Sequence, residues 1–312
     1  MQRFFTRCPG RGALLAAGTA LLVSALGVLC LLDFAEATPP TIGEFDGSEH
    51  RWQRTLCLLN LAEVMPQTGD RLVIGDMGFV PDNTGDQQLV VTWALLSEED
   101  DIKEVGVTVP LDLFDKQPTD PGPFPHESIA SLVFPEVVQD LTFLNHVELG
   151  TQPDGHEAPL SFANPQRNRV PHFDFHFYAI PEAQVWEIPE IRPWPNPLLP
   201  DVAPNRLPVG YMQPVFSALQ MGRHSNPLYS KLDPNVLETT MIAGFLPDAS
   251  QLHFIEPMIS REFLLKRNDF ELPVPMPAEF GQSMLYPTKC HAEYDALLDA
   301  YHFIFSEFVA VE

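Results

Sequence analysis

Proline is the residue that most restricts how this chain can fold. The sequence holds 32 prolines among 312 residues, and they are spread along the chain instead of being gathered in one linker. Proline lacks a backbone N–H and clashes with the preceding helical turn, so prolines at short intervals disfavour long helices. We therefore expect a mainly β protein with antiparallel sheets (sandwich- or barrel-like), a few short helices and long Pro-rich loops.

Hydrophobic alternation and turn residues locate the expected elements. Two hairpins are predicted, Leu89–Leu96 with Glu104–Val109 and Glu238–Leu246 with Gln251–Ile255. The other predicted strands are Thr142–Leu149, residues 172–180, Glu182–Glu187 and Tyr301–Val311. The predicted helices are residues 51–64, a short helix after Pro125 within Phe124–Val138, and one or two turns in Ser260–Lys266. Residues 188–208 are expected to form a long irregular loop.

The N-terminus has the pattern of a secretory signal. Arg3, Arg7 and Arg11 precede an apolar run from Ala13 to Leu32, and Ala35-Glu36-Ala37 follows as a cleavage site. We expect residues 1–37 to be a signal peptide and residues 38–312 to form a single β-rich exported domain. The alternative is an uncleaved anchor, because the apolar run is long enough to span a bilayer. Either reading places the domain outside the cytoplasm, in the periplasm or secreted.

The charge of the chain limits its partners. The sequence has 42 Asp and Glu against 18 Lys and Arg, a formal net charge of −24. Nucleic acids and anionic lipids are polyanions, so we expect no nucleic-acid partner and membrane contact only through the N-terminal segment. The expected partners are a small molecule or a metal ion, and exposed sheet edges allow a homo-oligomer. Whether Cys57 and Cys290 form a disulfide stays open.

The segment from His172 to Tyr178 carries the chemistry. On a strand its side chains alternate, so Phe173, Phe175 and Phe177 would point into a core. The opposite face would then carry His172, Asp174, His176 and Tyr178. Histidine and carboxylate side chains in one row suit a metal site, a proton-transfer site or a hydrogen-bonded network. The Cα atoms of His172 and His176 would be about 13 Å apart. A metal ion would therefore be bound more easily by Asp174 with one of the two histidines than by both histidines.

Other histidines and acids could complete the site. The favoured candidates are His156 after a Pro-Asp-Gly turn, His224 and Glu256. Weaker candidates are His126-Glu127, His146 and His253, whereas His291 and His302 are treated as ordinary. The predicted ligand set is His156, His172, Asp174, His176, His224 and Glu256, holding a divalent transition metal such as zinc, copper or iron. The alternative is a hydrogen-bonded strand without a metal. The sequence has no nucleophile elbow, H-E-x-x-H motif, P-loop or G-x-G-x-x-G motif.

Several stretches, taken in order, resemble one family of proteins. They are Val105-Gly106-Val107-Thr108, Gly155-His156-Glu157-Ala158-Pro159, Pro171-His172-Phe173-Asp174-Phe175-His176-Phe177-Tyr178, Met221-Gly222-Arg223-His224, Phe254-Ile255-Glu256-Pro257-Met258-Ile259 and Tyr286-Pro287-Thr288. The chain resembles an uncharacterised family of exported bacterial proteins, typified by a sigma/anti-sigma-regulated protein of a thermophile. The resemblance implies export and a shared fold, and it groups the candidate histidines with Glu256, but it implies no reaction. Ala158 and the residues after His224 depart from the family pattern.

Three hypotheses follow for the function. The first is an exported metal-binding protein without turnover, which predicts a closed coordination sphere. The second is a metal-dependent extracytoplasmic enzyme, a hydrolase or oxidoreductase, which needs an open coordination position beside a pocket. The third is a purely structural β-assembly protein whose histidines form a hydrogen-bonded network. Because the nucleophile motifs are missing, we rank the metal-binding protein without turnover slightly above the metal-dependent enzyme.

Overall fold

The computed structural model describes residues 70–118, 128–157, 164–232 and 234–312. These residues belong to one compact unit, Ala62–Glu312. The predicted signal peptide (1–37), the predicted helix at 51–64 and Cys57 lie outside the described residues. Within the described ranges, no helix is both long and apolar enough to cross a bilayer.

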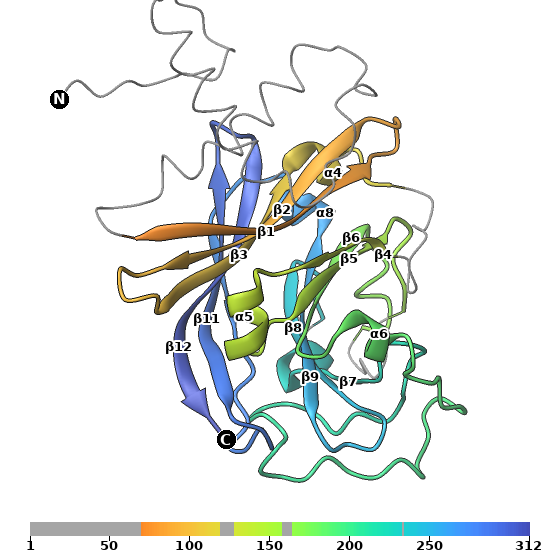
Figure 1. Ribbon diagram of the computed structural model, residues 1–312. Helices are drawn as coiled ribbons and strands as arrows, with labels where there is room; N and C mark the ends of the chain where they lie inside the picture. The colour runs from red at the N-terminus through yellow and green to blue at the C-terminus, as the bar shows by residue number, and fades with distance from the viewer. Residues whose placement is uncertain (1–69, 119–127, 158–163, 233) are drawn as a thin grey trace, which may run out of the picture. The chain divides into compact units, whose positions relative to one another are not determined.

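Two six-stranded sheets, each with antiparallel neighbours throughout, build this unit (Figure 1). The first sheet has the spatial order β1 (Arg71–Pro81), β2 (Gln87–Leu96), β3 (Ile102–Pro110), β12 (Ala300–Val311), β11 (Met284–Asp295) and β10 (Phe270–Pro273). The second has the order β4 (Ser128–Val133), β5 (His146–Gln152), β6 (His172–Tyr178), β9 (Leu252–Ser260), β8 (Thr239–Phe245) and β7 (Arg223–Ser225). The predicted mainly β, sandwich-like class is confirmed.

The helices among the described residues are short. They are α4 (Leu111–Asp115), α5 (Glu136–Leu141), α6 (Glu182–Val185), α7 (Leu228–Leu232) and α8 (Arg261–Leu264). Three of them begin directly after a proline, at Pro110, Pro135 and Pro181. Each of these prolines is the N-cap residue, with ψ of 140° to 148°, and proline fits there because its fixed φ is compatible with this conformation and it has no N–H that needs a partner. The prolines therefore divide the chain into short elements, as predicted.

The aromatic face of β6 lies in the core between the two sheets. The ring of Phe175 lies 4.5 Å from that of Phe303 on β12, measured between centroids, and Phe177 lies 4.7 Å from Phe305. All four rings are almost completely buried. Burial of each phenylalanine stabilises the fold by roughly 1.5–3 kcal/mol. The predicted alternation of β6 is confirmed, and it fixes which residues face the other way.

Some predicted elements are wrong or misplaced. Glu182–Glu187 was expected as a strand, but Pro181 starts the helix α6 there. The segment expected to form a helix after Pro125 instead holds strand β4, and α5 follows only after Pro135. Strand β5 begins at His146, four residues after the predicted start. At β4, pairing with β5 overrides the local helical preference.

The strand predicted to stop at Ile255 continues through Pro257 to Ser260 as β9, a central strand of the second sheet. Proline in a central strand removes one hydrogen bond of the ladder, which is why the sequence suggested an end. In the ladder between β6 and β9, Asp174 pairs with Met258 and Phe177 pairs with Ile255. This constant register places His176 opposite Glu256, beside the interruption.

Strands β1, β7, β10 and β11 were not predicted. Strand β11 contains Pro287 and polar residues, and β7 has only three residues. Both therefore lack the apolar alternation that sequence reasoning relies on. Strand β11 also carries Cys290, which is a buried free thiol. Burial raises the pKa of this thiol well above its usual range.

A covering layer encloses the outer face of the second sheet. A cluster of buried apolar residues joins this face to the segment after β6, and its members are Tyr178, Ile180, Val185, Ile188, Leu237, Ile242, Phe254 and Met258. Residues 188–208, predicted as an irregular loop, contain no helix or strand apart from one isolated bridge at Ile191, so that prediction is confirmed. The polar face of β6 is therefore buried between the sheet and this layer.

Candidate metal centres

The polar residues of β6 lie on one face of the second sheet, as their spacing predicted. His172, Asp174 and His176 are all buried, with side chains no more than 7% exposed. Burying imidazole and carboxylate groups costs free energy unless partners or a cation compensate them. The structure brings these residues together with ligands from three other parts of the chain.

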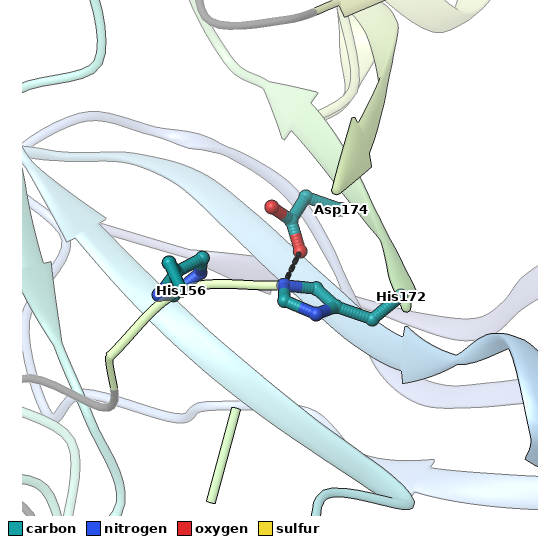
Figure 2. Close-up of side chains that lie close together, drawn as sticks. All are labelled: His156, His172 and Asp174. Atoms are coloured by element: carbon teal, nitrogen blue, oxygen red, sulfur yellow. Dashed lines mark ion pairs between the residues drawn. The ribbon is translucent and has the colours of Figure 1, made fainter. Parts of the chain in front are cut away.

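Group A consists of His156, His172 and Asp174. One ligand atom from each lies within 4.8 Å of the others (Figure 2). The Nε2 atom of His172 lies 3.5 Å from Oδ1 of Asp174, and the His156 ring lies edge-on to that of His172, with centroids 4.9 Å apart. Two ligands at about 2.1 Å from one tetrahedral ion are themselves about 3.4 Å apart. Group A therefore has the spacing of a metal site.

A tight turn brings His156 to β6. Strand β5 ends at Gln152, and Gly155 follows with φ of +61°. A Cβ atom on Gly155 would lie 2.4 Å from the carbonyl oxygen of Asn168, so only glycine fits both the conformation and the space. The N–H of His156 donates to that same carbonyl (3.1 Å). The Pro-Asp-Gly turn seen in the sequence thus positions the third ligand of group A.

Backbone carbonyls orient both histidines of group A. His172 Nδ1 lies 2.7 Å from the carbonyl oxygen of Val170, and His156 Nδ1 lies 2.9 Å from that of Glu157. A carbonyl only accepts, so each Nδ1 carries the hydrogen, and in the neutral imidazole Nε2 keeps its lone pair. Oδ1 of Asp174 accepts no hydrogen bond from the described residues. Group A therefore offers two nitrogen lone pairs and one carboxylate oxygen.

Group B consists of His176, His224 and Glu256, and its ligand atoms also lie within 4.8 Å of one another. Nε2 of His176 lies 3.7 Å from Oε1 of Glu256, and Nε2 of His224 lies 3.6 Å from Oε2. These distances again match ligands of one ion and exceed a hydrogen bond. The side chains of His176 and Glu256 are 3% and 4% exposed, whereas that of His224 is 13% exposed.

Two glycines lie beside His224 and shape its surroundings. His224 on β7 pairs with Gly244 on β8, so its side chain must pass over β8 to reach β9. Because Gly244 has no side chain, the ring of Phe254 lies over it, and a Cβ atom there would lie 1.9 Å from that ring. His224 packs against this ring, with centroids 5.1 Å apart. Gly222, with φ of +83°, sets the chain direction just before β7. No sequence pattern shows this path, because it depends on the strand order.

Glu256 lies in an environment that disfavours its ionised form. Burial raises the pKa of Glu256 well above its usual range, and the nearby charge of Asp174 raises it further. The ion pairs that Glu256 makes with other described residues are both with histidines. Its Oε2 atom accepts no hydrogen bond from the described part of the chain. A cation would stabilise this carboxylate.

Sequence reasoning missed Glu148 and ranked His146 low. Both lie on β5 and are completely buried, and His146 Nε2 lies 3.8 Å from Oε1 of Glu148. Glu148 pairs with His176 across the β5–β6 ladder, and His146 pairs with Tyr178. Burial raises the pKa of Tyr178 well above its usual range, and Glu148 and Glu256 add to this. The alternation of polar and apolar residues from His146 to Gly150 was the signal that could have identified Glu148.

The remaining histidine candidates belong to neither group. His253 is buried with Nε2 2.9 Å from the carbonyl oxygen of Met221, and burial lowers its pKa to about 3. His302 bonds Thr108 (2.8 Å), and His291 lies 3.3 Å from Glu293, so both have ordinary partners. His126-Glu127 lies outside the described residues.

The six predicted ligands therefore form two groups of three instead of one set. Each group could hold a metal ion. The spacing along β6 explains the division, because His172 and His176 are too far apart to share an ion. Each group supplies two imidazoles and one carboxylate, all from residues that the sequence had proposed.

Fold and geometry together define a sandwich-like β protein that carries two His/carboxylate groups on one buried sheet face. No protein-family model, curated protein or solved structure matches the chain. The resemblance to the family of exported bacterial proteins therefore stays a prediction.

Proposed function

We propose that this protein is an exported protein that binds a divalent transition metal ion through group A. The observation that carries the proposal is the orientation of its histidines. Because Val170 and Glu157 accept the Nδ1 hydrogens of His172 and His156, each neutral ring has its lone pair on Nε2, and Nε2 of His172 faces Asp174 at 3.5 Å. Metal-binding histidines commonly have this second hydrogen bond, which fixes the ring and its tautomer.

The donor set narrows the class of metal. Two imidazole nitrogens and one carboxylate oxygen suit zinc, iron or copper, and they bind magnesium or calcium poorly. The acidic chain, with a net charge of −24, also raises the local concentration of cations. We therefore propose zinc, copper or iron as the ion and a metal ion or small molecule as the partner.

The proposed location is extracytoplasmic, in the periplasm or the medium. Its support is the basic, apolar and A-x-A pattern of residues 1–37, with an uncleaved anchor as the alternative. A metal site open to the outside would take its ion from the surroundings of the cell. A homo-oligomer formed through sheet edges remains part of the proposal.

A metal-dependent enzyme, hydrolytic or oxidative, is the second candidate function. Structural zinc sites usually have four protein ligands, whereas catalytic sites have three and leave a position for water or substrate. Group A supplies three from the described residues. A cavity of about 300 Å³ adjoins the residues that flank His172, and its lining includes Val170, Pro171, Leu237 and Ser260. This volume is at the lower end for a small-molecule pocket.

Elemental analysis of the purified full-length protein tests the proposal. We expect His156→Ala, which removes the least buried ligand of group A, to contain one metal ion per chain fewer than the wild type. His291→Ala is the matched control, because His291 also lies beside a carboxylate but on the other sheet. If His156→Ala keeps as much metal as the wild type, group A is not the site. If no metal binds after reconstitution, the purely structural hypothesis is favoured.

A further inference from the structure

We propose that group B is a second ion site, independent of group A, and that Glu148 supports it from behind His176. The ligand is again a divalent transition metal. His176, His224 and Glu256 would bind the ion directly, while Glu148 would act as a positioning residue. The inference depends on the way that four strands of the second sheet converge.

The first argument is the burial of Glu256. Its side chain is 4% exposed, and no Lys or Arg pairs with it among the described residues. Its Oε2 atom accepts no hydrogen bond there and points to His224, 3.6 Å away. A buried carboxylate without a compensating charge is costly, and a bound cation removes that cost.

The second argument is convergence from distant parts of the chain. His176 comes from β6, Glu256 from β9 and His224 from β7. The ring of Phe254, which lies over Gly244, packs against both histidines, with centroids 5.3 Å from His176 and 5.1 Å from His224. Both histidines present Nε2 to Glu256, each to a different oxygen. Apolar packing alone does not require this arrangement. Phe216 stacks on the ring of His224, with centroids 5.5 Å apart, and holds it over the sheet.

The third argument is the position of Glu148. Strand β6 lies between β5 and β9, so His176 has Glu148 on one side and Glu256 on the other. Residues directly opposite each other on one sheet face have Cβ atoms about 5 Å apart. Nε2 of His176 is directed to Glu256, and Glu148 flanks the same residue from β5. If an ion held Nε2, the Glu148 carboxylate would be the neighbouring acceptor for the Nδ1 hydrogen of His176. Ser128 donates to Oε2 of Glu148 (3.3 Å) and holds it in place.

The two groups share no residue. His172 and His176 mark their positions along β6, about 13 Å apart at Cα. The two histidines therefore cannot share one ion, so each group would hold its own, with Asp174 of group A near enough to act on the charge of Glu256. This predicts two ions per chain, each lost by its own set of substitutions.

Zinc titration and elemental analysis of the full chain test this inference. We expect two zinc ions per wild-type chain, one in His156→Ala, one in Glu256→Gln and one in His224→Ala. The last variant changes the most exposed ligand of group B, so it keeps the test valid if Glu256→Gln misfolds. Glu148→Gln should weaken the second ion about 10–100-fold, the usual effect of losing a partner behind a metal ligand. Glu271→Gln, an exposed control on β10, should bind as the wild type does.

Each pattern of stoichiometry has its own meaning. A single ion that survives both group B substitutions but not His156→Ala would overturn the second site and leave the proposed function standing. A single ion lost in the group B variants but not in His156→Ala would overturn the proposed site at group A and leave the site at group B standing. Two ions with unchanged affinity in Glu148→Gln would overturn the role of Glu148. No bound zinc in the folded wild type would overturn both proposals.

Discussion

Glu256→Gln changes one buried carboxyl group and keeps its shape, so it measures what that charge costs the fold. Burial, and then the charge of Asp174, raise the pKa of Glu256 above its usual value of 4.5. The folded protein therefore holds this proton more tightly than the unfolded chain does. The stability contributed by the proton is complete below pH 4.5 and is lost as the pH rises toward the folded pKa, by about 1.4 kcal/mol per pH unit.

Without metal, the variant should therefore be more stable than the wild type at neutral pH, and the difference should vanish near pH 4. With zinc bound, the wild type should instead be more stable than the variant. An ion at 100 times its dissociation constant stabilises the wild type by about 2.7 kcal/mol, and the variant has lost a ligand. Urea unfolding from about pH 4 to pH 8, with chelator or with zinc, gives both differences. A metal-free variant that is less stable than the wild type at every pH would show that Glu256 already has a compensating partner.

Three further predictions concern other parts of the fold. Gly244→Ala should destabilise the protein by about 1–3 kcal/mol and weaken zinc binding at group B, since the new Cβ atom displaces the ring of Phe254; urea unfolding and zinc titration check this. Phe175→Ala should cost about 3–5 kcal/mol in urea unfolding, because this ring is fully buried between the sheets. Burial raises the pKa of Asp82, but hydrogen bonds from Thr84, Gln88 and Asp86 lower it overall. Asp82→Asn should therefore cost about 1–3 kcal/mol at neutral pH, and less as the pH falls below 3.8, in the same unfolding assay.

The faces of β6 could be predicted because strand geometry is local. Side chains alternate with a period of two, so the phenylalanines from Phe173 to Phe177 fixed the core face without any knowledge of the partner strands. The hairpins at 89–109 and 238–255 followed from polar turns between apolar runs in the same way. Strand β11 was missed because Pro287 and its polar neighbours break the alternation, although it pairs with β12 across a short turn and with β10 on its other side.

The division into two groups could not be predicted, because it depends on strand order. The sequence proposed all six ligands, but it did not show that β9 lies beside β6 or that β7 lies two strands from β9. Glu148 was missed for the same reason. Its place behind His176 follows from the β5–β6 register, and nothing within the octapeptide indicates it.

The register that packs the core also positions the candidate ligands. A slip of β6 by one residue would move Phe175 to the outer face and bury Asp174 between the sheets, so the core resists any such slip. Each group has two ligands on central strands, held in this way, and one histidine from the periphery: His156 after a turn and His224 on a short edge strand. These two histidines are also the ligands that are only partly buried. An ion would therefore meet His156 or His224 first and then complete its coordination on side chains that the core already holds in place.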